Sequence, residues 1–217
     1  GMDRIVRAAP ELLAQRDIGA FADRALRLMA ELLGDESADG VFCTRHPANG
    51  QKNGEASLHV AAALGAFASF RGRDVAAIDD PGLLEALERC GLSGGRLHES
   101  NGIALCLGTG EQKAMLYLRT GRPLNDLTRR LSDVLAVSIA AGLENVALLH
   151  KLDFYAYYDS LSRLPNRANF VAKIDECLER GEQGWTVAVV EVDHFSDINA
   201  ALGHQTGDLL LQAVARG

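Results

Sequence analysis

Apolar residues recur at helical spacing in the first part of the chain. They stand at steps of three and four residues between positions 18 and 32, and Gly34 follows them. This period places them on one face of an amphipathic helix, and a glycine just past the last apolar residue is a common helix stop. A second helix is predicted from Pro81 onward, because proline suits a first helical turn, where its missing N–H is not needed.

Short apolar runs between these helices predict strands. The runs cover residues 41–44, 58–63, 103–107 and 114–118, and turn-forming residues separate the last two. Two strands joined by such a loop are typical of a β-hairpin. Helices combined with a short, mainly antiparallel sheet predict an α+β domain.

From Leu124 the pattern changes to one long amphipathic helix, which continues without proline to about Tyr158. At 1.5 Å per residue such a helix spans roughly 50 Å. Its apolar stripe must be buried, either as a linker or dimer seam or, for its first half, against the helix's own sheet. The stripe consists of Leu124, Leu127, Leu131, Leu135, Ile139, Leu143, Val146 and Leu149.

Composition and charge narrow the class of protein. The chain has 217 residues, 47% of them hydrophobic, and Lys+Arg 22 against Asp+Glu 29 give a net charge of −7. Such an acidic chain offers no general cationic surface for nucleic acid or anionic lipid. No apolar run approaches the roughly 20 residues that a bilayer needs, and the four cysteines have no metal-ligand spacing. We therefore expect a cytoplasmic protein with no nucleic-acid and no membrane partner.

The chemistry-bearing residues lie in the last third of the chain. Residues 185–193 form a continuous apolar run that turns acidic at Glu191 and Asp193. A run that is apolar on both faces predicts a central strand, on which two acids two residues apart point to the same side. Paired carboxylates can hold a divalent metal, but acids at a strand end are also common as solvated groups. The spacing alone fits both interpretations.

Two short helices are predicted after this strand. They cover residues 195–202 and 209–215, with a glycine-flanked turn at 203–207 and Asp208 as the cap of the second helix. Asn199 and Asp208 carry amide and carboxylate groups that can hydrogen-bond to the edge of a purine. Taken singly, they are also ordinary helix-surface and N-cap residues.

Three sequence blocks in fixed order carry a family resemblance. The first, over 159–170, contains Leu-Ser-x-Leu-Pro-Asn-Arg; the second, over 191–199, is Glu-Val-Asp-His-Phe-Ser-Asp-Ile-Asn; the third, over 203–208, is Gly-His-x-x-Gly-Asp. Together they resemble the first half of a GGDEF domain, the diguanylate cyclase fold. In that family the fold is palm-like, and two GTP-loaded domains meet to make cyclic di-GMP.

The resemblance implies site residues one by one. A metal-binding carboxylate falls on Glu191 and a metal-binding backbone carbonyl on Val192, and Asp193 is a further candidate from its spacing. Magnesium is implied only for an intact GGDEF domain, so no cofactor is expected for this chain.

The implied nucleotide-binding residues lie further along. The guanine-reading pair falls on Asn199 and Asp208, and His204 lies beside the phosphates. GTP is accordingly implied as a ligand of the full-length protein.

The chain also departs from the family pattern. Glu191 stands where the family usually has Asp, Ser196 where it commonly has Lys, and Ala200 where it commonly has Asp. The Gly-Gly-(Asp/Glu)-Glu-Phe hairpin is absent from the sequence. No catalytic residue is therefore assigned, and we expect that this chain does not make cyclic di-GMP. These departures also resemble those of degenerate GGDEF domains that are fused to EAL phosphodiesterase domains. The resemblance implies that such a GGDEF domain acts as a GTP-responsive regulator of the phosphodiesterase.

The region before the long helix is similar in its order of elements to a GAF-like or PAS-like sensory domain. More specifically, it resembles the regulatory domain found between a receiver domain of two-component systems and a GGDEF domain. We predict a regulatory domain over 1–123, a linker and dimerisation helix over 124–158, and a truncated N-terminal part of a GGDEF domain over 159–217.

These expectations combine into one functional hypothesis. The chain would form a homodimer through the linker helix and the regulatory domain and relay a signal to the GGDEF portion. The alternatives are a full-length parent that is an active diguanylate cyclase, or one in which this domain regulates a fused EAL phosphodiesterase in response to GTP.

Overall fold

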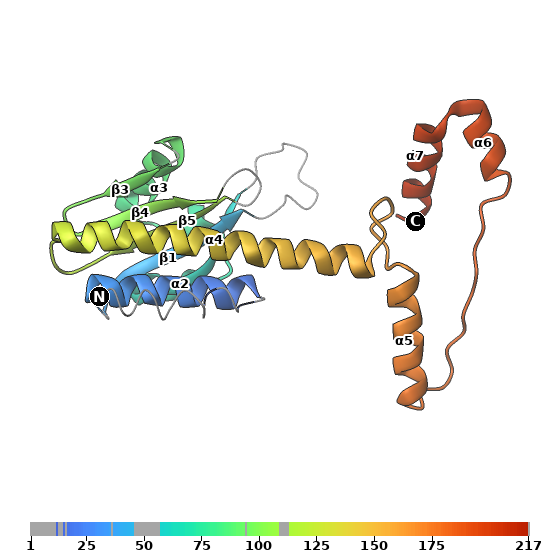
Figure 1. Ribbon diagram of the computed structural model, residues 1–217, viewed down its shortest axis with the longest axis horizontal. Coiled ribbons are helices and arrows are strands. Elements are labelled where there is room, and N and C mark those ends of the chain that lie inside the picture. Colours follow the sequence, from blue (N-terminus) through green and yellow to red (C-terminus); the bar gives the residue numbers. More distant parts are fainter. Residues whose placement is uncertain are drawn as a thin grey trace. The chain divides into compact units, whose positions relative to one another are not determined.

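The structure is a computed structural model of the chain and describes residues 12, 15, 17–35, 37–45, 57–93, 95–108 and 113–216. The chain divides into two compact units, Gly1–Leu149 and His150–Gly217, and each is described by itself (Figure 1). The domain boundaries expected at residues 123 and 158 stay predictions.

A five-stranded antiparallel sheet forms the centre of the first unit. The strand order is β2-β1-β5-β4-β3, and every neighbouring pair is antiparallel. The sheet and its helices confirm the predicted α+β class. In chain order the elements are α2 (Ile18–Leu33), β1 (Asp39–Arg45), β2 (Leu58–Leu64), the 3-10 helices η1 (Gly65–Phe70) and η2 (Val75–Ala77), α3 (Pro81–Ser93), β3 (Arg96–His98), β4 (Gly102–Leu107), β5 (Ala114–Arg119) and α4 (Asp126–Tyr157).

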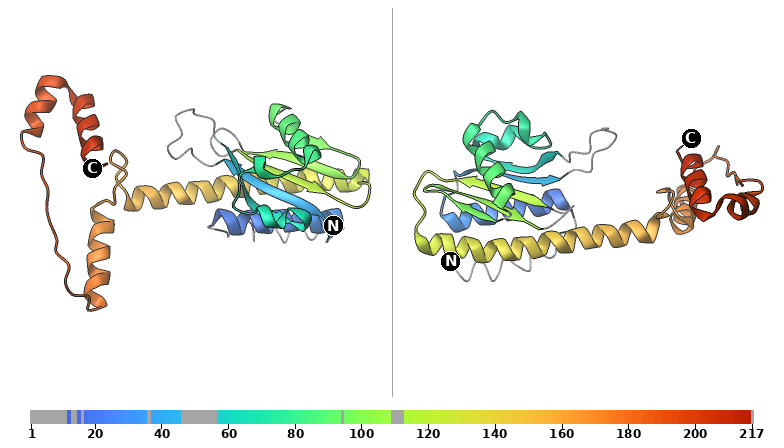
Figure 2. Two further views of the ribbon diagram at one scale, coloured as in Figure 1. Left: turned by 180° about the vertical axis from the view of Figure 1, so that it is seen from behind. Right: turned by 90° about the horizontal axis from the view of Figure 1, so that it is seen from above.

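Alternate residues of the strands face two separate hydrophobic cores. Phe42 and Leu116 belong to the core beneath α2 and α4, whereas Val41 and Met115 belong to the core beneath η1, η2 and α3. Figure 2 shows α2 and α4 on one face of the sheet and α3 on the other. This separation follows from the two-residue period of a strand, and each fully buried Leu, Ile or Phe contributes about 1.5–3 kcal/mol to folding.

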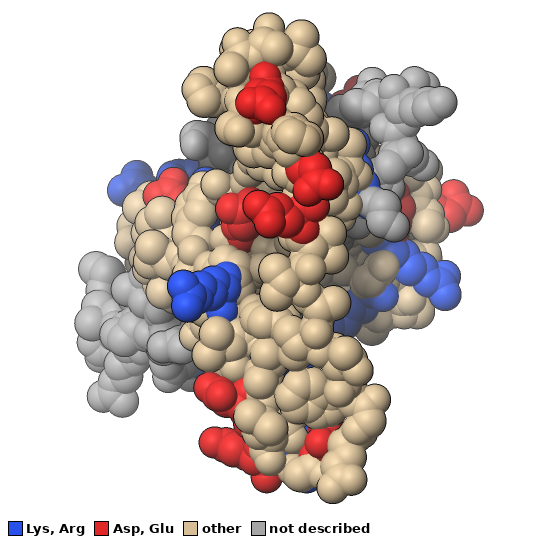
Figure 3. Space-filling view, turned by 90° about the vertical axis from the view of Figure 1, so that its right-hand side faces the viewer, with Lys and Arg blue, Asp and Glu red and all other residues tan. Residues whose placement is uncertain are grey.

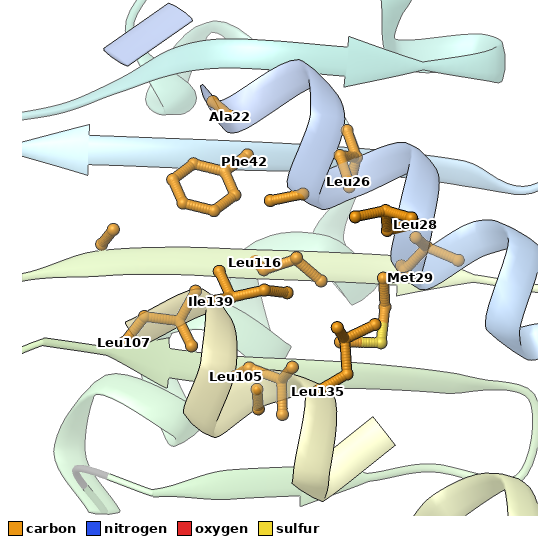
Figure 4. Close-up of a cluster of buried hydrophobic side chains, with 14 of the residues drawn as sticks. Ala22, Leu26, Leu28, Met29, Phe42, Leu105, Leu107, Leu116, Leu135 and Ile139 are labelled. Atoms are coloured by element: carbon orange, nitrogen blue, oxygen red, sulfur yellow. The ribbon is translucent and has the colours of Figure 1, made fainter. Parts of the chain in front are cut away.

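Helix α4 is the long helix that the sequence predicts. The first half of its stripe packs on its own domain, since Leu135, Ile139 and Leu143 are buried with strand and α2 residues in one core. Figure 4 shows Leu135 and Ile139 among these residues. This outcome is the alternative that the sequence left open for the first half. Leu127 was expected in the same stripe, but it is 67% exposed because it lies on another side of the helix.

Helix α4 is also the one described helix that is long and apolar enough to cross a membrane by length and composition, with a mean hydropathy of 1.5 in its most apolar window. A single helix of this kind is weak evidence for a membrane span, because core helices pass the same test. The burial of Leu135, Ile139 and Leu143 accounts for much of its apolar character.

Gly142 allows α4 to approach α2 closely. A Cβ atom placed on Gly142 would lie 2.6 Å from Cε2 of Phe21, whose ring is fully buried and meets Phe42 edge to face. The ring cannot move aside easily, since interiors are close-packed. The missing side chain at this position therefore sets the distance between the two helices.

Arg119 connects the sheet to the elements over the second core. Its guanidinium lies 2.9 Å from Asp80 at the start of α3 and 3.3 Å from Asp39 on β1, and it lies over the ring of Phe67 on η1. The pKa of Asp80 is lowered, first by the hydrogen bond that it accepts from the Leu83 N–H and also by Arg119, against the opposing effect of desolvation.

The second unit contains α5 (Arg167–Glu179), α6 (Phe195–Leu202) and α7 (His204–Val214). Among its described residues only Gly207 is buried. The central strand predicted over 185–193 is wrong: the segment forms no strand, and Val189 and Val190 are 94% and 84% exposed. A strand needs a neighbour for its backbone hydrogen bonds, and the described part of this unit holds no second strand.

The predicted start of the last helix is also wrong. Asp208 was expected as its N-cap, but α7 begins at His204 with Gly203 as N-cap, so the predicted turn over 203–207 is mostly helical. The reason is tertiary: Gly207 is buried, and Asn199 of α6 packs against it. The contact between α6 and α7 thus overrides the local turn signal of the glycines.

We predict that Gly142→Ala destabilises the protein by about 1–2 kcal/mol, because the overpacking cost against Phe21 exceeds the roughly 1 kcal/mol gain in helix propensity. Gly91→Ala in α3 is the matched control, since its new methyl would meet only the flexible end of Met115. Urea denaturation measures both. Equal or higher stability of Gly142→Ala would contradict the close approach.

We also predict that Asp80→Asn lowers stability at pH 7 by about 1 kcal/mol, because asparagine keeps the helix cap but loses the ion pair with Arg119. A carboxylate with a lowered folded-state pKa stabilises the protein above its unfolded pKa of about 4, and this contribution is lost as the pH falls through the folded value. The difference from wild type should therefore shrink below about pH 4. Thermal unfolding between pH 7 and pH 3 tests this, with Asp79→Asn at the exposed neighbouring carboxylate as control; a pH-independent difference would refute it.

Candidate functional site

The first motif block forms a tight turn between α4 and α5. The Asp159 carboxylate accepts hydrogen bonds from the backbone N–H of Ser162 at 2.7 Å, from its hydroxyl at 2.8 Å and from the Leu161 N–H at 3.2 Å. These bonds, the one from the Ser162 N–H foremost, lower the pKa of Asp159. Asn166 then caps α5 by accepting from the Asn169 N–H at 3.1 Å.

The expected metal-binding residues lie on the segment before α6. Glu191 and Asp193 are exposed and Val192 is half-buried. Carboxylate and carbonyl oxygens are the donors that magnesium prefers. However, in the part of the chain that the structure describes, no three His, Cys, Asp or Glu side chains come together as a metal site. Two exposed carboxylates on an open segment do not complete a coordination shell, so the described residues alone do not fit a bound magnesium ion.

The expected nucleotide-binding residues belong to the pair of helices α6 and α7. The Oδ1 atom of Asn199 is buried without a hydrogen-bond partner and packs against Gly207, next to the exposed Asp208. Any side chain at Gly207 would displace Asn199. The structure thus brings Asn199 and Asp208 to neighbouring places. His204 is exposed at the start of α7. The expected metal-binding residues, Glu191, Val192 and Asp193, lie outside the helices α6 and α7.

His194 is a feature of this region that the sequence analysis missed. It is the N-cap residue of α6 with a left-handed backbone (φ 55°), and its Nδ1 lies 3.1 Å from Oδ2 of Asp197. A positive φ is uncommon in residues other than glycine, and histidine is enriched there together with asparagine and aspartate, so the residue type permits this conformation without predicting it.

Much of the apolar surface of the second unit is uncovered. Figure 3 shows acidic and basic side chains in separate small groups on this face, between residues of all other kinds. Exposed apolar side chains include Phe170, Leu178, Val189, Leu202 and Leu209. Their exposed fractions range from 47% for Phe170 to 94% for Val189.

A second stripe on α4 was also missed. Leu127, Val134, Leu148 and Tyr155 are 67%, 51%, 56% and 64% exposed, and the exposed Ala141 stands midway between the middle two. The five positions are spaced by seven residues. The signal was available in the sequence as a strict period of seven, but the more continuous stripe that packs on the sheet concealed it.

Comparisons with known proteins follow the same division of the chain. Residues 1–152 match the family described as Domain of unknown function (DUF3369), and residues 156–217 match the diguanylate cyclase GGDEF domain family.

Among curated proteins, the chain is similar to a cyclic di-GMP phosphodiesterase, NbdA, of Pseudomonas aeruginosa, with 41% identity over 80 residues, 32% of this chain and 10% of the relative. It is also similar to diguanylate cyclase TpbB of the same species, with 40% identity over 76 residues, 33% of this chain and 16% of the relative. The chain thus spans less than one fifth of the length of these relatives.

Two solved GAF domains resemble the chain in structure. One, from an Acinetobacter phosphoenolpyruvate-protein phosphotransferase, has a TM-score of 0.48 and 9% identity over 68% of this chain and 94% of its own. The other, from a putative sensor histidine kinase of Pseudomonas syringae, has a TM-score of 0.44 and 17% identity over 70% and 90%.

The family matches confirm the GGDEF resemblance of the three motif blocks and extend to the region before them. Because the first match covers more than half of its residues, the chain belongs to the DUF3369 family, and its C-terminal part is GGDEF domain sequence.

Proposed function

We propose that this chain is a regulatory and dimerisation module of a cyclic di-GMP signalling protein, which relays a signal to its GGDEF portion. One observation carries the proposal: α4 is a single 32-residue helix that begins in the core of the first unit and continues to the GGDEF sequence. The names of the relatives, a phosphodiesterase and a diguanylate cyclase, support the assignment to this signalling class.

The relay depends on the burial of α4 in the first unit. Leu135, Ile139 and Val146 share one core with strands of the sheet, so a change in that core shifts or rotates the helix. A helix moves largely as a unit, because each residue is bonded to the next turn. A displacement at its buried half therefore reaches the half that enters the second unit.

The homodimer that we propose uses the exposed stripe of α4. Its residues repeat every seven positions, as one position of a coiled-coil heptad does, and the exposed Leu152 follows Leu148 by four residues, which is one step of a coiled-coil seam. A strict seven-residue repeat is complementary to another helix with the same repeat, and a second copy of α4 provides one. In this proposal the regulatory domain contributes to the same dimer contact.

The proposed dimer would act in the cytoplasm, without a nucleic-acid or membrane partner.

For its own chemistry, we propose that this chain is inactive. Its sequence contains no Gly-Gly-(Asp/Glu)-Glu-Phe hairpin, and Glu191 and Asp193 do not come together with a third ligand in the described residues. In the full-length protein, GTP would be read by Asn199 and Asp208, and magnesium would be bound at Glu191 and Val192. The second candidate function belongs to the full-length protein, which would be an active diguanylate cyclase or would regulate a fused phosphodiesterase in response to GTP. The name of a further relative, the bifunctional diguanylate cyclase/cyclic di-GMP phosphodiesterase MucR, supports this candidate; it is 32% identical over 87 residues, 12% of that protein.

We expect Val134→Lys combined with Leu148→Lys to convert a dimer into a monomer in sedimentation equilibrium. Each substitution places a charge where apolar burial would be gained in each copy, and this gain is about half of the 1.5–3 kcal/mol of a full burial, because Val134 and Leu148 are about half exposed in the single chain. Both residues are exposed in the single chain, so its fold should survive. Leu92→Lys, at an 83% exposed leucine on α3, is the matched control and should remain dimeric. A wild-type chain that is monomeric at high concentration would refute the dimer.

We expect no cyclic di-GMP when this chain is incubated with GTP and magnesium and the nucleotides are separated by chromatography. Any cyclic di-GMP above the level of a Glu191→Ala control would contradict the proposed inactivity. The same measurement on the full-length protein separates an active diguanylate cyclase from a GTP-responsive regulator, because only an active cyclase forms the product.

A further inference from the structure

The junction between α4 and α5 has an unusual arrangement of hydrogen bonds. The last carbonyl groups of a helix have no partner within the helix and need one elsewhere. In α4, the carbonyl of Ala156 accepts a hydrogen bond from Nδ2 of Asn166 at 2.9 Å, and the carbonyl of Tyr157 accepts one from the backbone N–H of Asn166 at 2.9 Å. One residue therefore occupies two acceptors at the end of α4.

The same residue holds the beginning of α5. The Oδ1 atom of Asn166 accepts from the Asn169 N–H at 3.1 Å as the N-cap of that helix. A single primary amide thus donates to the end of one helix and accepts from the start of the next. Among short side chains only asparagine supplies a donor and an acceptor at this reach, since aspartate has no proton to donate and serine is too short to reach both groups.

The turn between the two helices is braced by further contacts. The Asp159 N–H donates to the carbonyl of Leu164 at 2.9 Å, which closes the turn (Figure 1). Arg163 adopts a left-handed backbone (φ 62°) and places its guanidinium 5.0 Å from the ring centre of Phe154, which is stacked on Tyr158. A backbone conformation that arginine rarely adopts persists only where its surroundings hold it.

We infer that Asn166 is a pin that joins α4 rigidly to α5, so that a rotation of the linker helix is transmitted to the first helix of the GGDEF portion instead of being absorbed at a hinge. The inference rests on the proposed function for its role in signalling, but not for the geometry of the joint. According to this inference, the side chain of Asn166 transmits the motion of α4 to the GGDEF portion.

Pulsed electron paramagnetic resonance tests the joint. Spin labels at Lys151→Cys on α4 and Asp175→Cys on α5, both exposed sites, report the distribution of distances across it. Cys106→Ser and Cys177→Ser remove the two accessible thiols. Cys43 and Cys90 can stay, because burial raises their pKa values to about 12 and about 11 and leaves them unreactive. Excess unlabelled protein restricts the signal to pairs within one chain.

Asn166→Asp separates the two roles of this side chain, which are donation to the Ala156 carbonyl and capping of α5. Aspartate caps a helix as well as asparagine does and is favoured at the positive start of α5, but it cannot donate to Ala156 and is repelled by the negative end of α4. We expect a narrow distance distribution in the wild type and a broad one in Asn166→Asp, with hydrogen exchange in the first turn of α5 unchanged. Asn166→Ser, which keeps a cap without added charge, should also broaden the distribution.

The matched control is Asn125→Asp at the other end of α4. Asn125 accepts from the Thr128 N–H at 2.8 Å as a cap, and aspartate should preserve both that cap and the narrow distribution. The inference is overturned by a broad wild-type distribution, by a narrow one in Asn166→Asp, or by loss of α5 in both Asn166 variants. A failure of dimerisation or of nucleotide binding would contradict the proposed function and leave this result intact, because the labels report on a single chain.

Discussion

The burial of one side of α4 against the sheet is the contact on which the rest of the structure depends. Gly142 makes it possible, because only a residue without a Cβ lets the helix approach the buried ring of Phe21. Phe21 in turn packs edge to face on Phe42 of the central part of the sheet. The position of α4 is therefore fixed by the same interior that holds the strands together, and a change in that interior cannot leave the helix where it is.

A helix that is fixed on one side presents its other side to solvent, and in α4 that other side is also apolar. The two sides differ in what covers them. The stripe with Ile139 and Leu143 is buried in the chain's own core, whereas Val134 and Leu148 of the other stripe are 51% and 56% exposed. One helix can thus belong to a domain core and leave a second apolar stripe exposed, and the proposed homodimer and relay would both use this single element.

The sequence was a good guide where structure depends on local period and a poor one where it depends on distant partners. The antiparallel sheet and α4 were predicted because short apolar runs, turn residues and helical spacing are local properties. The strand expected over 185–193 is absent, since an apolar run becomes a strand only beside another strand, and the start of α7 was misplaced because Gly207 packs on Asn199. The order of the motif blocks identified the candidate site residues, but their spatial grouping could not be read from that order.

The two units hold their helices in different ways, and this difference explains why the junction matters. In the first unit apolar burial fixes the helices, while in the second unit Gly207 is the one buried residue among those described. A unit without a core cannot transmit a displacement through packed side chains. Polar contacts at the ends of its helices must do so, and the Asn166 amide, bonded to Ala156 on one side and Asn169 on the other, is the contact that continues α4 into α5. The relay proposed for this chain would therefore depend on hydrophobic packing at Ile139 and on hydrogen bonding at Asn166.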